Sequence, residues 1–175
     1  MSAPNVVGLD LSLSATGIAL PDGTTLTIKP KPANLRGGAR LSYLADRLDD
    51  LIKFSPLDLV VIEDYSPGAI GIAGKLANAQ WRGVVEMMLH DFQRAAPVAF
   101  IKPNTLKRWA TGNGAADKPA MVAAAIAAGW TGDPKRHDEA DAYHLRAMGL
   151  QYLTGQGTAA QLEVCDSTAW PEATS

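Results

Sequence analysis

Cysteine is almost absent from this 175-residue chain, and Cys165 is the only one. A single cysteine excludes an internal disulfide framework and every zinc motif built from several cysteines. The chain also lacks the roughly 18 consecutive apolar residues of a membrane span. Its N-terminus lacks the basic and then hydrophobic segment of a signal peptide. We therefore expect a soluble protein of the reducing cytoplasm whose single domain buries its own core.

A net positive charge, which would favour nucleic-acid binding, is missing as well, since the formal charge is −2. The charge is unevenly distributed, however. Residues 151–175 hold three of the 18 acids and no lysine or arginine, which leaves 16 basic and 15 acidic residues in 1–150. Residues 24–45 and 92–116 contain basic residues and no acid. Because charge placement matters more than the total, these two segments are candidate phosphate-facing strips around an acidic centre.

Hydrophobic patterning predicts alternating strands and helices. Five segments have the composition of strands: residues 5–10, 14–20, 24–29, 57–63 and 97–101. Apolar residues at helical spacing predict helices over 38–54, 72–92, 103–110 and 117–128, and a last helix after Pro134. Pro21-Asp22-Gly23 is a strong hairpin turn between the second and third strands. This order predicts an α/β fold with a mixed five-stranded sheet, three antiparallel strands and then parallel ones, flanked by helices.

The end of the chain differs from the rest in composition. After Thr154, Gly, Thr, Ala, Gln and Ser predominate without periodicity. We predict one domain over residues 1–153 and a polar, flexible tail over 154–175, in which Cys165 has no role.

Four acidic residues occupy positions that favour a shared site. Val6-Val7-Gly8-Leu9 leads into Asp10, and Leu59-Val60-Val61-Ile62 leads into Glu63, so each carboxylate ends a buried strand. Asp138 and Asp141 are three residues apart, which places them on one side of a helix. Like charges there repel one another unless a cation lies between them.

Carboxylate oxygens are the ligands that Mg²⁺ takes in proteins, together with waters and substrate phosphate oxygens. Two such ions about 3.5–4 Å apart can activate water and stabilise the leaving oxygen in a displacement at phosphorus. The four acids therefore suggest a two-metal nuclease site. The alternative is that they are ordinary surface acids, because pairs three residues apart on a helix arise often by chance.

The order of these motifs resembles the RuvC family of Holliday-junction resolvases, which have an RNase H-like fold. The resemblance runs from Val6 to Met148 and is carried by Val7-Gly8-Leu9-Asp10 with Thr16-Gly17, by Val61-Ile62-Glu63 and by Asp138-Glu139-Ala140-Asp141-Ala142. It implies a homodimeric endonuclease that resolves four-way DNA junctions by Mg²⁺-dependent hydrolysis and paired nicks, with Mn²⁺ as a substitute. Asp10, Glu63, Asp138 and Asp141 would hold two metal ions per site.

The same resemblance assigns roles to other segments. Lys107 and Lys118, on either side of the Thr111-Gly112-Asn113-Gly114 turn, would contact the scissile phosphate or stabilise its developing charge. Arg108 and Asn113 would contact DNA. The helix around residues 72–92, with Leu76, Ala79, Gln80, Gly83, Val84, Met87 and Met88 in one stripe, would pack at the dimer interface, although it could instead pack on the sheet.

Some positions depart from the family pattern. Leu11-Ser12 replaces the usual Pro-Gly after the first Asp, which is similar to divergent phage-encoded members and leaves the partner helicase open. Ser66 stands where the family often has a junction-wedging aromatic; Tyr65 could stack on an unpaired base or simply pack in its loop. We favour ordinary packing roles for His137, His144, Trp81 and Trp109 over roles in the chemistry.

Other functions fit parts of the pattern. A broader flap or fork nuclease would share the same chemistry, and a non-catalytic junction-binding module would share the fold. Gly8-Leu9-Asp10-Leu11-Ser12 also resembles a phosphate loop of actin-like sugar kinases, but those need two such domains and this chain is too short.

Overall fold

The structure, a computed structural model, describes residues 3–53, 56–64, 72–91 and 96–171. Its centre is a five-stranded sheet in the order β3-β2-β1-β4-β5. The strands are β1 (Val6–Asp10), β2 (Thr16–Ala19), β3 (Thr25–Ile28), β4 (Leu59–Glu63) and β5 (Val98–Ile101). β1, β2 and β3 pair antiparallel, whereas β4 is parallel to both β1 and β5. The predicted mixed α/β sheet is confirmed.

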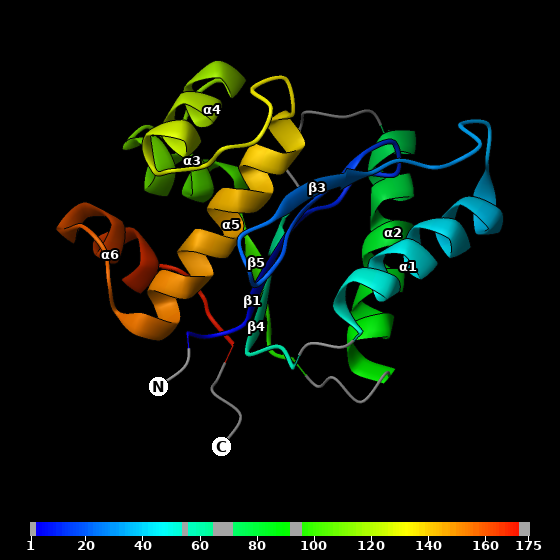
Figure 1. Cartoon of the computed structure of the whole chain (residues 1–175), viewed down its shortest axis with the longest axis horizontal. Coiled ribbons are helices and arrows are strands. Elements are labelled where there is room, and N and C mark those ends of the chain that lie inside the picture. Colours follow the sequence, from blue (N-terminus) through cyan, green and yellow to red (C-terminus); the bar gives the residue numbers. More distant parts are fainter. Residues whose placement is uncertain (1–2, 54–55, 65–71, 92–95, 172–175) are drawn as a thin grey trace.

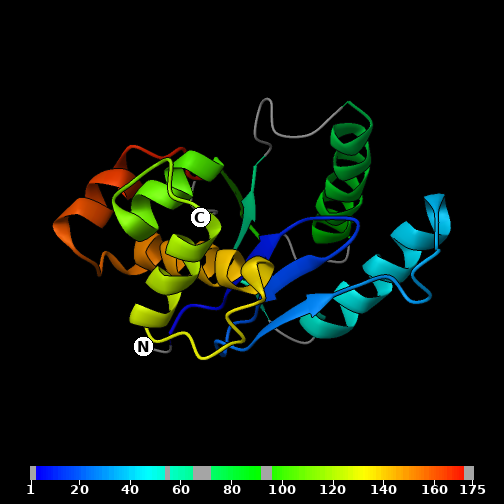
Figure 2. The ribbon, with the colours of Figure 1, turned by 90° about the horizontal axis from the view of Figure 1, so that it is seen from above.

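Helices cover both faces of the sheet (Figure 1). On one face lie α1 (Gly37–Ile52) and α2 (Ile72–Asp91). On the other lie α3 (Pro103–Thr111), α4 (Lys118–Ala127), α5 (His137–Thr154) and α6 (Ala159–Asp166). The view from above shows the same two layers, with α5 running along the sheet (Figure 2).

Side chains alternate between the two faces of each strand, so each face has its own core. Val7, Leu9, Val60 and Ile62 pack with Leu44 and Leu48 of α1 and Trp81 and Val85 of α2. Val6, Leu59, Val61 and Ile101 pack with Leu106, Leu145 and Met148 on the opposite face. Trp81 and Trp109 are both buried, as predicted. The β-branched runs therefore form strands buried on both faces.

The chain after residue 154 differs from the sequence-based prediction of a loose tail. Residues 159–166 form α6, which begins with a capping box between Thr158 and Gln161. Val164 and Cys165 are buried in the core between α3, α5 and α6. Cys165 is thus a core residue, and its pKa is raised to about 11 by burial. The domain boundary at residue 153 stays a prediction.

None of the helices in the described part of the chain is both long and apolar enough to cross a membrane.

Candidate active site

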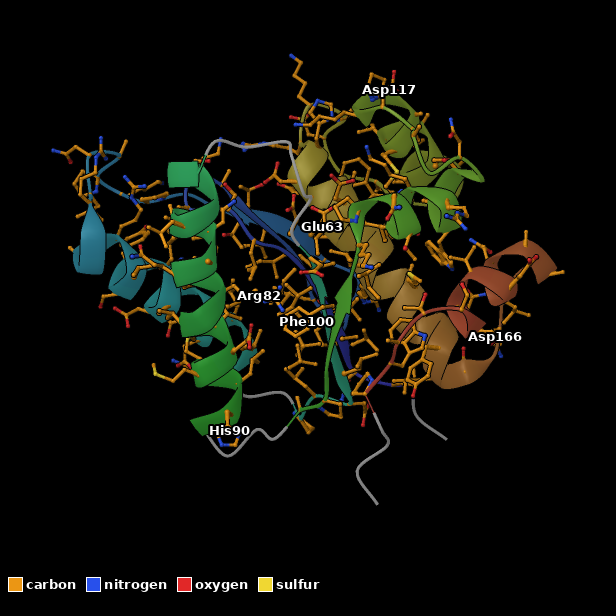
Figure 3. The ribbon with its side chains drawn as sticks, turned by 180° about the vertical axis from the view of Figure 1, so that it is seen from behind. Glu63, Arg82, His90, Phe100, Asp117 and Asp166 are labelled. Atoms are coloured by element: carbon orange, nitrogen blue, oxygen red, sulfur yellow. The ribbon has the colours of Figure 1, made fainter. Side chains whose placement is uncertain are left out.

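The register of the sheet aligns one row of residues at its edge. Asp10 pairs with Gly17 of β2, and Gly17 pairs with Thr27 of β3. On the other side of β1, Leu9 pairs with Ile62, which puts Glu63 beside Asp10. Residues in one row of a sheet point to the same face. Thr27, Asp10 and Glu63 therefore all face α5, and Figure 3 shows Glu63 at this end of the sheet.

Two glycines let α5 approach this row closely. A Cβ atom added to Gly17 would lie 2.0 Å from the backbone oxygen of Asp138, and one added to Gly8 would lie 2.2 Å from that of Ala142. Only glycine can stand where backbone comes so near. The helix that carries Asp138 and Asp141 therefore lies directly on β1 and β2, and the predicted convergence of strand acids and helix acids is present.

Asp10 and Glu63 form a hydrogen-bonded carboxyl pair. Burial, together with repulsion from Asp141 and Asp138, raises the pKa of Asp10 to about 7. Burial and the negative charges of Asp10 and Asp141 raise the pKa of Glu63 to about 9. Two carboxylates this close repel each other when no cation lies between them, so the pair keeps a proton.

Asp141 belongs to the same cluster. Burial raises its pKa to about 6, although the positive charges of Lys118, Lys107 and His137 oppose this. Lys118 also lowers the pKa of Asp10, and Lys107 that of Glu63. Lys107 comes from α3 and Lys118 begins α4. The structure thus brings both predicted lysines beside the acids.

The Asp138 carboxylate has a separate partner. Its Oδ2 atom accepts a hydrogen bond from the hydroxyl of Thr27, which also lies 2.9 Å from Oε1 of Glu139. Asp138 and Glu139 lie in the first turn of α5, where the positive end of the helix dipole stabilises negative charge. Asp138 is therefore held toward β3, next to the cluster of Asp10, Glu63 and Asp141.

The donor set suits a hard divalent cation. Within the described residues, no three Asp, Glu, His or Cys side chains already stand close enough to enclose a metal ion. Mg²⁺ does not need such a cage, because it usually binds one or two carboxylates and completes its shell with waters and phosphate oxygens. Asp10, Glu63 and Asp141 supply only oxygen ligands, and a cation among them would relieve the repulsion that raises their pKa values.

The remaining predicted residues lie in several places. Arg108 and Asn113 are exposed. The Asn113 side chain accepts a hydrogen bond from the backbone N–H of Ala115 at 2.9 Å, which shapes the turn after α3. Tyr65 lies outside the described residues. His144 is buried, with its Nε2 atom 3.0 Å from the carbonyl of Met121, so it packs in the core.

Sequence reasoning missed the residues that hold the site together. The buried Thr16 hydroxyl accepts the indole N–H of Trp81 at 3.0 Å and donates to the Ser12 carbonyl at 2.8 Å, which ties α2 to the loop after Asp10. Arg82 of α2 pairs with Asp64, the residue after Glu63, at 2.6 Å, and its guanidinium lies 3.6 Å from the centre of the Phe100 ring (Figure 3). No local signal identifies such partners, because they depend on how α2 docks.

Comparison with known proteins identifies the family of this chain. The family model described as crossover junction endodeoxyribonuclease RuvC matches residues 23–147. RuvC of Saccharopolyspora erythraea is 30% identical over 169 residues, which cover 90% of this chain and 82% of that protein. The predicted phage origin stays a prediction.

Solved structures show the same fold. T. thermophilus RuvC in complex with Holliday junction substrate has a TM-score of 0.72 at 17% identity, over 96% of this chain and 99% of that one. The yeast mitochondrial Holliday junction resolvase Ydc2 has a TM-score of 0.54 at 14% identity, over 94% and 81% of the two chains. The family-model match and the relative at 30% identity show that the chain belongs to the RuvC family of crossover junction endodeoxyribonucleases.

Proposed function

We propose that this protein is a structure-selective endonuclease that resolves four-way DNA junctions by paired hydrolytic nicks. The observation that carries the proposal is the acidic cluster of Asp10, Glu63 and Asp141, with Asp138 beside it and two lysines facing it, in a chain of the RuvC family. Such a protein would act in the cytoplasm of a bacterial cell, where junction DNA forms.

Asp10, Glu63, Asp138 and Asp141 would hold two Mg²⁺ ions, for which Mn²⁺ would substitute. When bound, such ions activate water and stabilise the charge that develops on the phosphate oxygens. Asp10 and Glu63 must lose the proton between them to serve as ligands. Burial and the nearby negative charges, which raise the pKa of both groups, favour that proton when no cation is bound.

Lys107 and Lys118 would act on the DNA rather than on the metal. The positive charge of both lysines lowers the pKa of Asp141, so both would also attract a phosphate bound beside the acids. An ammonium group there neutralises charge on the non-bridging oxygens of the scissile phosphate. Arg108 and Asn113, exposed nearby, extend this contact along the backbone, and Tyr65 would stack on an unpaired base.

A homodimer would form through α2. Trp81, Val85 and Leu89 of this helix are buried against the sheet, which leaves Leu76 and Met87 exposed at 61% and 56%. Large apolar side chains at such exposure favour a protein contact. A two-fold axis along α2 would present two active sites to a pseudo-symmetric junction, as paired nicks require.

The test is cleavage of a synthetic four-way junction whose strands carry separate labels. With Mg²⁺ or Mn²⁺, wild-type protein should nick two opposite strands at symmetric positions and leave a linear duplex of the same sequence intact. Asp10→Asn and Asp138→Asn should abolish the nicks and keep junction binding within a few-fold. Asp46→Asn, at an exposed acid of α1, is the matched control and should cleave normally.

The substrate panel also separates the alternatives. Equal cleavage of flaps, forks and four-way junctions would support the broader branched-DNA nuclease. Tight junction binding without cleavage under either metal would support a binding module and contradict the proposed nuclease.

A further inference from the structure

A series of hydrogen bonds runs from the α4–α5 connection across β3 to Asp138 and Glu139 of α5. The indole N–H of Trp130 donates to the Thr25 hydroxyl at 2.9 Å. Thr25 Oγ1 lies 3.3 Å from Oε2 of Glu139, and Thr27 Oγ1 lies 2.9 Å from Oε1 of the same residue. Thr27 also donates to Oδ2 of Asp138.

The chemistry of the donors fixes the direction of this series. Tryptophan can only donate, so the Thr25 oxygen accepts and its proton is directed to Glu139. The Thr27 hydroxyl has one proton and lies between two carboxylates. Because Thr25 already donates a hydrogen bond to Glu139, the Thr27 proton is available to Asp138. Thr27 therefore fixes the carboxylate of Asp138, and Thr25 fixes that of Glu139.

The sheet register places Thr27 in the active-site row. Thr27 pairs with Gly17, which pairs with Asp10, so the three residues face α5 from neighbouring strands. Gly17 has no side chain to separate Thr27 from Asp10, and the backbone of Asp138 lies directly over it. Thr27 thus reaches the acids from β3, one edge strand of the sheet, whereas Lys107 comes from α3, the helix that follows β5, the other edge strand.

From this geometry we propose that Thr27 is a positioning residue that orients Asp138 for metal binding, while Thr25 donates to Glu139 and so leaves the Thr27 proton for Asp138. The inference rests on the proposed nuclease function. One oxygen of Asp138 is fixed by the Thr27 hydroxyl, and the other is left for the cation. Residues that orient a metal ligand in this way typically contribute 10–100-fold to metal affinity or activity.

The test compares Thr27→Val, which keeps the branched shape and removes the hydroxyl, with Thr27→Ser, which keeps the hydroxyl. For Thr27→Val we expect kcat for junction cleavage to fall about 10–100-fold, with KM for the junction and the melting temperature close to wild type. Thr27→Ser should retain most of the activity. Thr24→Val, on an exposed threonine of the β2–β3 turn, controls for the substitution itself.

A second readout does not depend on turnover. Mn²⁺ affinity of the free protein, measured by electron paramagnetic resonance of unbound Mn²⁺, should fall about 10-fold or more in Thr27→Val. In an Asp138→Asn background the same change should add little, because Thr27 acts through Asp138.

Three results would overturn the role of Thr27: wild-type Mn²⁺ affinity in Thr27→Val, equal losses in Thr27→Ser and Thr27→Val, or a full additional loss in the Asp138→Asn background. If wild-type protein binds Mn²⁺ but cleaves no junction, the proposed function fails. The Mn²⁺ titration then still decides the role of Thr27.

Discussion

At the scale of single residues, the site consists of buried carboxyl groups that the fold holds close together although they repel one another. Asp10, Glu63 and Asp141 come from three different elements, and each has a raised pKa because it is buried near the others. A protein does not gain stability from such an arrangement. The cluster is therefore explained by what it binds.

The raised pKa values predict how stability depends on pH without metal. For Glu63 the pKa rises from 4.5 to about 9 on folding, so between these values the folded state keeps a proton that the unfolded state releases. The free energy of unfolding should therefore fall as pH increases through this window. Glu63→Gln removes the cost of ionisation and should stabilise the protein by about 1 kcal/mol or more at pH 8, which is roughly 2–4 °C in melting temperature.

Thermal unfolding in EDTA at pH 5 and pH 8 measures this effect. Asp46→Asn, at an exposed acid, should leave the pH dependence unchanged. A destabilised Glu63→Gln, or a variant whose pH dependence equals that of wild type, would contradict the assignment of a protonated Glu63.

Divalent cations should have the opposite effect. Mn²⁺ displaces protons from the carboxyls and binds only the folded state, so saturating Mn²⁺ should raise the melting temperature, and more at pH 8 than at pH 5. The increase should be largely lost in Asp10→Asn. An equal increase in wild type and in Asp10→Asn would place the cation elsewhere.

At the scale of secondary-structure elements, the contact of α5 with β1 and β2 decides the geometry of the site. The helix is close because Gly8 and Gly17 have no side chains. Gly17→Ala would force the backbone of Asp138 away from β2 and should cost about 1–3 kcal/mol or more in the free energy of unfolding. We expect a still larger loss of cleavage, because Asp138 and Asp141 move with the helix.

Gly38→Ala is the matched control, since the added Cβ meets nothing within 4 Å and Gly38 lies in helix α1. It should be neutral or stabilising by a few tenths of a kcal/mol to about 1 kcal/mol. Denaturant unfolding and junction cleavage on both variants measure the two effects. Wild-type cleavage by Gly17→Ala would show that α5 need not lie so close.

The sequence predicts much of this level of structure because the signals are local. Val6-Val7-Gly8-Leu9 and Leu59-Val60-Val61-Ile62 are apolar runs that form strands buried on both faces, and the carboxylates that end them meet at one edge of the sheet. Helix α6 is missed because only Val164 and Cys165 of it are buried, so it has no apolar stripe. Its capping box, Thr158 with Gln161, is a signal that could have identified it.

Thr27 could not be predicted in the same way. Thr25-Leu26-Thr27-Ile28 reads as an ordinary alternating strand, with polar residues on one face. Only the pairing of Thr27 with Gly17, and of Gly17 with Asp10, brings its hydroxyl to the acids. The register between strands depends on tertiary structure, and it is hard to predict from a single sequence.

At the scale of the whole molecule, the proposed paired nicks need two active sites, and we propose that two copies join through α2. Leu76→Lys or Met87→Lys places a charge on the exposed face of this helix without touching the residues that pack on the sheet. Each should shift the protein from dimer to monomer in sedimentation velocity and leave the melting temperature of the subunit nearly unchanged. Ile126→Lys, at an apolar residue of α4 that is 48% exposed, is the control and should stay dimeric.

Junction resolution by this site is measured most directly by cleavage of a supercoiled plasmid that extrudes a cruciform. A dimer with two acidic sites should cut both strands during one encounter, so wild-type protein with Mg²⁺ should convert the plasmid to the linear form with little nicked circle. Asp10→Asn should leave it supercoiled. Absence of any cleavage with Mg²⁺ or Mn²⁺, or cleavage of equal efficiency in Asp10→Asn, would contradict a junction-resolving nuclease at this site.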